Sequence, residues 1–159
     1  DALICARHRD GRRFLIPIEW KYVEKYGNKD KSTGSKGDER KARYLDLIKS
    51  SRYLNEHTPS YCWFEPFYQL MRQTLWAEQL LKHRPTGFEA DNYLHLHVVP
   101  EDNAELLDKS YPCSNKGMID TWESCLNYPE KYTVVHPNQL WSKQSKDTAI
   151  YEYLSKRYW

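Results

Sequence analysis

The stretch Arg13–Tyr22, RFLIPIEWKY, decides how this chain folds. It is rich in aromatic and β-branched residues, which is typical of a β-strand. Because successive side chains of a strand point to opposite faces, Glu19 and Lys21 share one face. Ile18 and Trp20 share the other. A carboxylate and an ammonium beside one another on an otherwise apolar strand are unfavourable unless they are paired or solvated at a site, so this pair is the first candidate for chemistry.

The residues before this strand complete a β-hairpin, because Asp10-Gly11 is a turn signal. The length of the loop decides what lies opposite Glu19. A two-residue loop sets Asp1 across from Trp20, on the wrong face. A three-residue loop that ends in a left-handed glycine sets Asp1 across from Glu19. A bulge at the proline of the second strand would shift the register again, and the alternatives stay open at this stage.

A loop and two helices are expected next. Lys, Gly, Ser, Asp and Asn dominate residues 24–43, which predict a mobile basic loop that leads into a helix near Asp38–Ser50. The strongest helix signal begins at Glu65-Pro66, since proline is tolerated in the first turn, and ends before Pro85. Its apolar stripe has helical spacing and consists of Phe67, Leu70, Met71, Leu75 and Leu81.

The remaining segments add strands and helices. Asn92–Val99 alternates with a period of two and is expected to be a strand. The order of hairpin, helix, strand and helix is typical of a mixed α/β domain. The later elements are expected to be a helix around Met118–Leu126, a short strand at Tyr132–His136 and a final helix near Asp147–Arg157.

Composition excludes several classes of protein. The 159 residues suggest one domain. The 24 basic and 22 acidic side chains leave a net charge of +2, so any basic surface for nucleic acid has to be local. The longest apolar runs, such as Leu15–Ile18, are far too short to span a bilayer, and the start of the chain has no signal-peptide pattern. We therefore expect no membrane partner.

The four cysteines, Cys5, Cys62, Cys113 and Cys125, have no C-x-x-C spacing. This distribution is typical of reduced thiols in an intracellular protein, and we expect a cytoplasmic location. A nucleophilic role for Cys62 or Cys125 would need a positioned histidine, which the sequence does not indicate.

Two further motifs have ordinary explanations. His95 and His97 lie on one strand face, and H-x-H can chelate a transition metal. No third ligand lies nearby in the sequence, so an ordinary half-exposed strand is favoured. The stretch Gly27–Gly37 lacks the phosphate-binding pattern of a P-loop. Its lysines could follow a nucleic-acid backbone or could simply be solvated.

The hairpin and the following helix together resemble the PD-(D/E)XK nuclease superfamily, which has the restriction-endonuclease-like fold. The matching residues are Asp1 for the lone aspartate, Glu19-Trp20-Lys21 for the (D/E)-x-K element, and Gln69 on the helix. More closely, IEWKY (18–22) with FYQLMRQTLWAE (67–78) is similar to a group of uncharacterised prokaryotic members. The resemblance implies one α/β domain over residues 1–159, with a mixed sheet of four to five strands flanked by helices. It also implies that a helix precedes Asp1.

The same resemblance implies a metal-dependent nuclease acting on DNA. Asp1, Glu19 and the carbonyl of Trp20 would hold Mg²⁺ or Mn²⁺, hard cations that prefer oxygen ligands. Asp1, Glu19 and Lys21 would be the catalytic residues. Lys21 would orient or deprotonate the attacking water and offset charge at the phosphorus atom.

Gln69 and Arg72, one turn apart, would contact the site or a backbone phosphate, and are the expected substrate-binding residues. The alternative is an exposed polar helix face. Likewise, Glu19 and Lys21 could be a surface ion pair on a half-exposed strand. A second triplet, Glu39-Arg40-Lys41, lies in a charged helical stretch and is expected to be solvated.

Two other functions remain open because a fold does not determine a function. The domain could be a catalytically inactive module that binds nucleic acid or protein on a nuclease-like fold. It could also be a protein-interaction domain that uses the aromatic tail, which contains Tyr151, Tyr153, Tyr158 and Trp159. The oligomeric state is left open.

Overall fold

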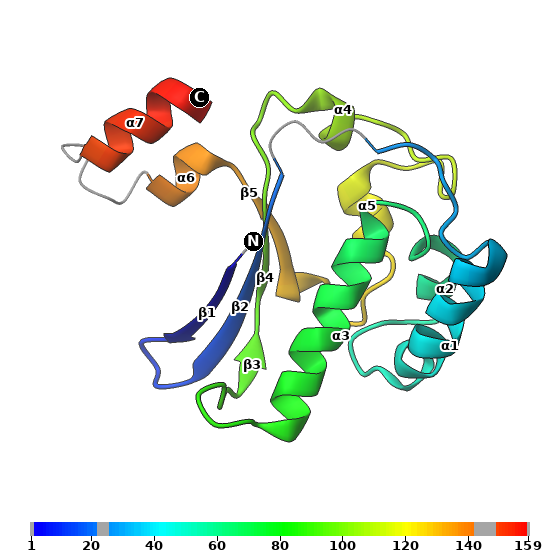
Figure 1. Ribbon diagram of the computed structural model, residues 1–159. Helices are drawn as coiled ribbons and strands as arrows, with labels where there is room; N and C mark the ends of the chain where they lie inside the picture. Colours follow the sequence, from blue (N-terminus) through cyan, green and yellow to red (C-terminus); the bar gives the residue numbers. More distant parts are fainter. Residues whose placement is uncertain (1, 22–25, 142–148, 159) are drawn as a thin grey trace.

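A computed structural model describes residues 2–21, 26–141 and 149–158 of the chain (Figure 1). A five-stranded mixed sheet has the order β1-β2-β4-β5, and β3 also pairs with β2. β1 is antiparallel to β2, while the other pairs are parallel. The expected mixed sheet of four to five strands flanked by helices is confirmed. The strands are β1 (Ala2–Arg7), β2 (Arg13–Trp20), β3 (Asn92–Tyr93), β4 (His95–Val98) and β5 (Tyr132–Val135).

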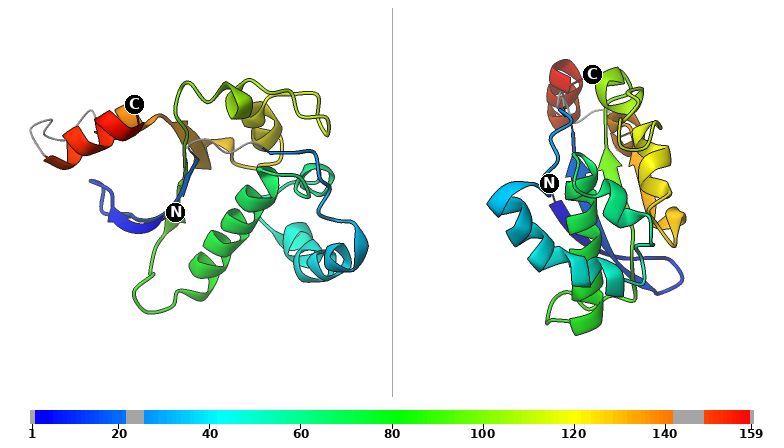
Figure 2. Two further views of the ribbon diagram at one scale, coloured as in Figure 1. Left: turned by 45° about the horizontal axis from the view of Figure 1, so that its top comes forward. Right: turned by 90° about the vertical axis from the view of Figure 1, so that its right-hand side faces the viewer.

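The helices lie on both sides of this sheet. α1, α2, α3 and α5 gather on one side, with α3 along the sheet, and α6 and α7 lie on the other side near the end of β5 (Figures 1 and 2). The helices are α1 (Gly34–Ser50), α2 (Thr58–Tyr61), α3 (Phe67–His83), α4 (Ala104–Leu107), α5 (Met118–Glu123), α6 (Pro137–Trp141) and α7 (Ala149–Tyr158), with one 3₁₀ turn at Pro129–Lys131. In these described residues, no helix is both long enough and apolar enough to cross a membrane.

The hairpin has the register of a three-residue loop. Its pairs run from Ala2 opposite Ile18 to Arg7 opposite Arg13, and Gly11 has a φ of +90°, a left-handed value that favours glycine. The register predicted with Gly11 in the left-handed region is therefore confirmed over the described pairs. Asp1 lies outside the described residues, so its position opposite Glu19 stays a prediction.

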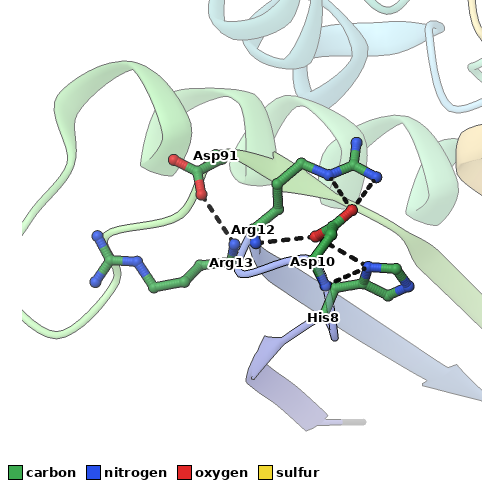
Figure 3. Close-up of polar contacts among 5 residues, drawn as sticks. All are labelled: His8, Asp10, Arg12, Arg13 and Asp91. Atoms are coloured by element: carbon green, nitrogen blue, oxygen red, sulfur yellow. Dashed lines mark hydrogen bonds and ion pairs between the residues drawn. The ribbon is translucent and has the colours of Figure 1, made fainter.

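Polar contacts hold the hairpin loop (Figure 3). The Asp10 carboxylate accepts hydrogen bonds from the backbone N–H of Arg12 at 3.0 Å and from its Nε at 2.7 Å. These bonds lower the pKa of the Asp10 carboxyl from its ordinary value. The backbone N–H of Arg13 donates to Asp91 Oδ2 at 2.9 Å. This bond ties the start of β2 to the segment that enters β3.

The strand expected over Asn92–Val99 is interrupted at Leu94, which separates β3 from β4. The N–H of Lys21 donates to the carbonyl of Val98 at 2.9 Å. The same parallel register brings position 17 opposite the carbonyl of Leu94, and Pro17 has no N–H to donate. The missing bond explains why one expected strand forms two.

α1 begins earlier than the sequence predicts. The loop expected over residues 24–43 is wrong from residue 34 on, because α1 starts at Gly34 rather than near Asp38. The first turns of this helix are mostly exposed, so no apolar period marks them. Gly37 faces the preceding loop so closely that a Cβ would lie 2.2 Å from the carbonyl carbon of Ser32.

One core cluster joins α3 to α1, α5 and the start of β5, and a smaller cluster joins α3 to β2 and β3. The α3 stripe is confirmed, since Phe67, Leu70, Met71 and Leu75 are buried, whereas Leu81 is half-buried. Trp122 of α5 adds the largest fully buried side chain. The later helix at α5, the strand at β5 and the final helix at α7 form close to their expected positions. The short helices α2, α4 and α6 were not predicted, because four or five residues carry no measurable period.

Gly37→Ala is expected to lower the free energy of unfolding by roughly 1–3 kcal/mol, because the new methyl group would overlap the backbone of Ser32. Helix propensity alone predicts the opposite sign, a gain of about 1 kcal/mol. Urea unfolding measures the difference. Gly27→Ala is the matched control, since a Cβ there meets nothing within 4 Å. Equal stability of both variants would contradict the close approach.

Candidate active site on the central strands

Glu19 and Lys21 form a buried ion pair at the end of β2. Glu19 is 1% exposed and the Lys21 side chain is 8% exposed, and Lys21 Nζ contacts Glu19 Oε1. The buried and half-buried residues of β2 alternate, so both side chains face α3 while Ile18 and Trp20 face away. The shared face is confirmed, and the alternative of a surface pair on a half-exposed strand is wrong. Two charges removed from water in this way need close mutual pairing.

The environment of Lys21 favours its charged form. Burial lowers the pKa of the ammonium, but hydrogen bonds with Glu19 and Tyr26 raise it, and the net direction is upward from the ordinary value. Lys21 therefore remains a cation near neutral pH. This geometry suits a lysine that stabilises negative charge better than one that removes a proton.

The helix residue that contacts Glu19 is Gln73 rather than Gln69. Gln73 Nε2 donates to Glu19 Oε2. Gln69 lies one turn earlier on α3, where its Oε1 accepts a hydrogen bond from the Tyr26 hydroxyl at 3.2 Å. The sequence identified the correct helix and missed this residue. The i,i+4 spacing of the two glutamines could have indicated it, because such residues share a helix face.

His97 lies beside Glu19 in the sheet. The two residues are register partners on the parallel strands β2 and β4, and His97 is completely buried, as is His95 on the same face. The strand was predicted correctly, but the expected half exposure is wrong, because α3 covers this face. Burial lowers the pKa of each histidine to about 3, so both imidazoles are neutral at pH 7. Sequence spacing could not reveal the Glu19–His97 pair, since the sheet brings them together.

Donor atoms around Glu19 have unused capacity. Among the described residues, Gln73 Oε1 and His97 Nε2 are buried without a hydrogen-bond partner. Gln73 contacts Glu19 through its other amide atom, and His97 is the register partner of Glu19. Buried polar atoms are normally satisfied by protein, water or an ion. Carboxylate and amide oxygens are the donors that small divalent cations prefer, and an imidazole nitrogen is a common ligand of transition metals. The residues present therefore fit a small divalent cation.

The full ligand set predicted from the sequence is not described. Asp1 lies outside the described residues, and the role of the Trp20 carbonyl stays a prediction. Within residues 2–21, 26–141 and 149–158, no group of three or more His, Cys, Asp or Glu side chains is arranged to hold a metal ion.

A pocket of about 520 Å³ opens beside Glu19, between α1 and α3. Both predicted substrate-binding residues, Gln69 and Arg72, line it, as does Trp76, which is 46% exposed. The other lining residues are Tyr44, Leu47, Gln73, Leu75 and Gln79. Glu19, the carboxylate of the buried pair, thus borders a polar and aromatic opening.

Three basic side chains surround one aromatic ring near this pocket. The charged groups of Lys31, Arg40 and Arg72 lie 4.9, 5.8 and 5.6 Å from the ring centroid of Tyr68. Lys31 also pairs with Glu65. We call these three residues the Tyr68 basic cluster. It supplies local positive charge that the overall net charge of +2 does not reveal.

The other candidates are less suited to chemistry. Burial raises the pKa of the Cys62 and Cys125 thiols to about 12, which disfavours the nucleophilic thiolate. In the second Glu-x-Lys triplet, Glu39 is exposed and Lys41 pairs with Asp38 across 3.6 Å. The expectation of a solvated position is therefore confirmed for that glutamate.

The aromatic tail is only partly described. Tyr153 of α7 is 57% exposed and Tyr151 is half-buried. Trp159 lies outside the described residues, so an aromatic interaction patch at this end stays a prediction.

The fold and the Glu-x-Lys pair together define the class of protein. A mixed sheet flanked by helices, with this pair on the second strand, is consistent with a restriction-endonuclease-like domain. The sequence model of one family, described as Restriction Endonuclease associating with ARP, matches residues 1–159. The chain therefore belongs to this family. No curated protein and no solved structure matches the chain. The closer resemblance to a prokaryotic group with the IEWKY motif stays a prediction.

The two buried histidines are expected to make the fold sensitive to acid. An unfolded histidine binds a proton near pH 6.5, at about its ordinary pKa, whereas the folded pKa values of His95 and His97 are about 3. Their stabilising effect is complete above about pH 6.5. It falls by roughly 1 kcal/mol per pH unit for each histidine as the pH drops toward 3.

Urea unfolding between about pH 7 and pH 5, with EDTA present, measures this dependence. His95→Gln is expected to reduce the slope by about half of the histidine contribution. His83→Gln, at an exposed position of α3, is expected to leave the slope unchanged. If His95→Gln left the pH dependence of the free energy of unfolding unchanged, His95 would not be a buried neutral imidazole.

Proposed function

We propose that this protein is a metal-dependent nuclease that hydrolyses phosphodiester bonds in DNA, with its catalytic site at the end of β2. Membership of a restriction-endonuclease family supports a nuclease and an interaction with nucleic acid. The Glu19–Lys21 pair is buried, yet Glu19 lines an open pocket. An ion pair kept out of water in this way contributes little net stability and is common at functional sites.

Each residue has a defined part in this reaction. Asp1, Glu19 and the Trp20 carbonyl would hold Mg²⁺ or Mn²⁺. When bound, such a cation stabilises charge on the scissile phosphate and activates a water molecule. Gln73 fixes the orientation of the Glu19 carboxylate through its hydrogen bond.

Lys21 acts on the charge that develops during hydrolysis. A water oxygen forms a bond to phosphorus while the bond from phosphorus to the leaving oxygen breaks, which yields a phosphate monoester and an alcohol. Negative charge grows on the phosphoryl oxygens meanwhile. The Lys21 ammonium, held in place by Glu19, is a compact charge that can offset it.

The pocket and the Tyr68 basic cluster provide a path for the substrate. Arg72 belongs to both, because it lines the pocket beside Glu19 and lies over the Tyr68 ring. Phosphate contacts of this kind position the backbone of nucleic acid without reading its sequence. We assign Arg72 to a backbone phosphate and Gln69 to the substrate next to the reacting group.

Neutral substitutions in the site test the catalytic assignment. Glu19→Gln keeps the shape of the side chain, and Lys21→Met removes the charge. Each is expected to reduce cleavage of plasmid and single-stranded DNA with Mg²⁺ or Mn²⁺ by at least about 100-fold, the scale of losing a key electrostatic group. The second Glu-x-Lys triplet offers the matched controls, Glu39→Gln and Lys41→Met, which are expected to cleave as the wild type does.

Folding has to be checked because either single substitution leaves one buried charge without its partner. This is expected to lower the free energy of unfolding by about 3–5 kcal/mol. The double variant Glu19→Gln with Lys21→Met removes both charges, and circular dichroism reports whether it folds. Loss of cleavage in this folded double variant supports the proposal. Cleavage that persists in it would contradict the assignment of the site. Absence of both cleavage and metal binding in the wild type would favour an inactive binding module on the same fold.

Arg72→Ala is expected to weaken DNA binding and to reduce the slope of log K against log salt by about 0.7–0.9, the contribution of one phosphate contact. Fluorescence anisotropy at several salt concentrations, with EDTA to prevent cleavage, measures the slope. Arg84→Ala is the control, because Arg84 is exposed at the opposite end of α3, where it lies 4.0 Å from Asp91. If the slope were unchanged in Arg72→Ala, Arg72 would not contact a DNA phosphate.

A further inference from the structure

His97 is a buried neighbour of Glu19 to which the proposed reaction assigns no part. The two residues are direct register partners on adjacent parallel strands, and such strands lie about 4.7–4.9 Å apart. Both side chains are on the sheet face covered by α3, and both are at least 99% buried. The two side chains therefore leave neighbouring strands side by side, and the Lys21 ammonium is near enough for its charge to act on the His97 ring.

The hydrogen bonds of His97 leave one ring nitrogen available. Nδ1 lies 2.9 Å from the hydroxyl of Tyr132, a buried residue on the next strand. Nε2 is buried and has no hydrogen-bond partner among the described residues. When Nδ1–H donates to the Tyr132 oxygen, Nε2 presents a lone pair. This is the usual arrangement of a histidine that binds a metal, in which the other ring nitrogen is oriented by a hydrogen bond.

We propose that His97 Nε2 and the Glu19 carboxylate bind one divalent cation, and that the imidazole directs the site toward Mn²⁺ rather than Mg²⁺. Mg²⁺ keeps to oxygen ligands, whereas imidazole nitrogen suits transition metals, and Mn²⁺ also accepts carboxylate and water. This inference rests on the proposed metal-dependent function. It adds one nitrogen donor, His97 Nε2, to the oxygen ligands expected from the sequence.

His95 is the appropriate comparison on the same strand. It is equally buried, and neither of its ring nitrogens has a hydrogen-bond partner among the described residues. The register that sets Glu19 beside His97 sets His95 beside Pro17, whose ring offers no ligand atom. If burial alone made a histidine bind metal, both residues would do so. The inference assigns binding to His97 alone.

Pulsed electron paramagnetic resonance of Mn²⁺ bound to the untagged full chain tests this inference without requiring cleavage. A coordinated imidazole gives ¹⁴N modulation of the Mn²⁺ echo, and ¹⁵N-histidine labelling changes it. The wild type is expected to show this signal and to bind Mn²⁺ at least tenfold more tightly than Mg²⁺ in a calorimetric titration. His97→Gln is expected to lose the nitrogen signal and to weaken Mn²⁺ binding by roughly 10–100-fold. His95→Gln is expected to retain both.

The outcomes separate this inference from the proposed function. Mn²⁺ binding that needs Glu19 but shows no histidine nitrogen would exclude His97 as a ligand and leave the metal-dependent nuclease intact. A nitrogen signal that disappears in His95→Gln and persists in His97→Gln would also overturn the inference. A wild-type chain that binds neither Mn²⁺ nor Mg²⁺ would overturn both. The wild-type spectrum is informative even if His97→Gln does not fold.

Discussion

The structure depends on a carboxylate and an ammonium that are kept out of water together on the central strand. Neither Glu19 nor Lys21 could be buried alone without losing several kcal/mol of stability. Their burial requires a neighbouring strand on one side and a helix above, and β4 and α3 supply these. A domain that needed only stability would gain as much from two apolar side chains at these positions. The proposed catalytic role gives this buried pair a reason that stability alone does not.

The surrounding architecture follows from this requirement. The parallel pairing of β2 with β4 brings His97 beside Glu19, and α3 adds Gln73 above the carboxylate. Apolar residues of α3 hold the helix against the core, so its polar residues meet the site on one edge. The pocket opens along that edge toward Arg72. In the proposed reaction, the sheet would position the charged pair, and the helix would supply both the orienting amide and the approach for a phosphate backbone.

Local patterns predicted much of this from the sequence, and long-range contacts account for the rest. The two-residue period of Arg13–Tyr22 and the turn at Gly11 predicted the hairpin. They left more than one strand register possible. The apolar stripe predicted α3. The start of α1 was missed because its first turns are exposed and show no apolar period. The feature found there is the close approach of Gly37 to the preceding loop. The strand division at Leu94 depends on Pro17, almost eighty residues earlier in the sequence.

The site shows the same division. Glu19 and Lys21 could be identified from one strand, since two residues of spacing set their common face. Gln73 and His97 could not be ranked above their neighbours, because Gln69 and His95 have the same residue types and nearly the same surroundings in sequence. Only the way α3 packs over Glu19 and the register of β4 distinguish them. Side chains that join a site from separate elements are determined by packing, which no local period encodes.

The proposed function requires a divalent-cation site at the end of β2. Anomalous diffraction at the manganese edge, from crystals of the full chain soaked in Mn²⁺, tests it most directly. We expect a peak within roughly 2–2.5 Å of a Glu19 carboxylate oxygen, the bonding range of such ligands, on the face that His97 shares. An ion bound elsewhere on the chain, with the Glu19–Lys21 pair intact and no peak beside it, would contradict the proposed site.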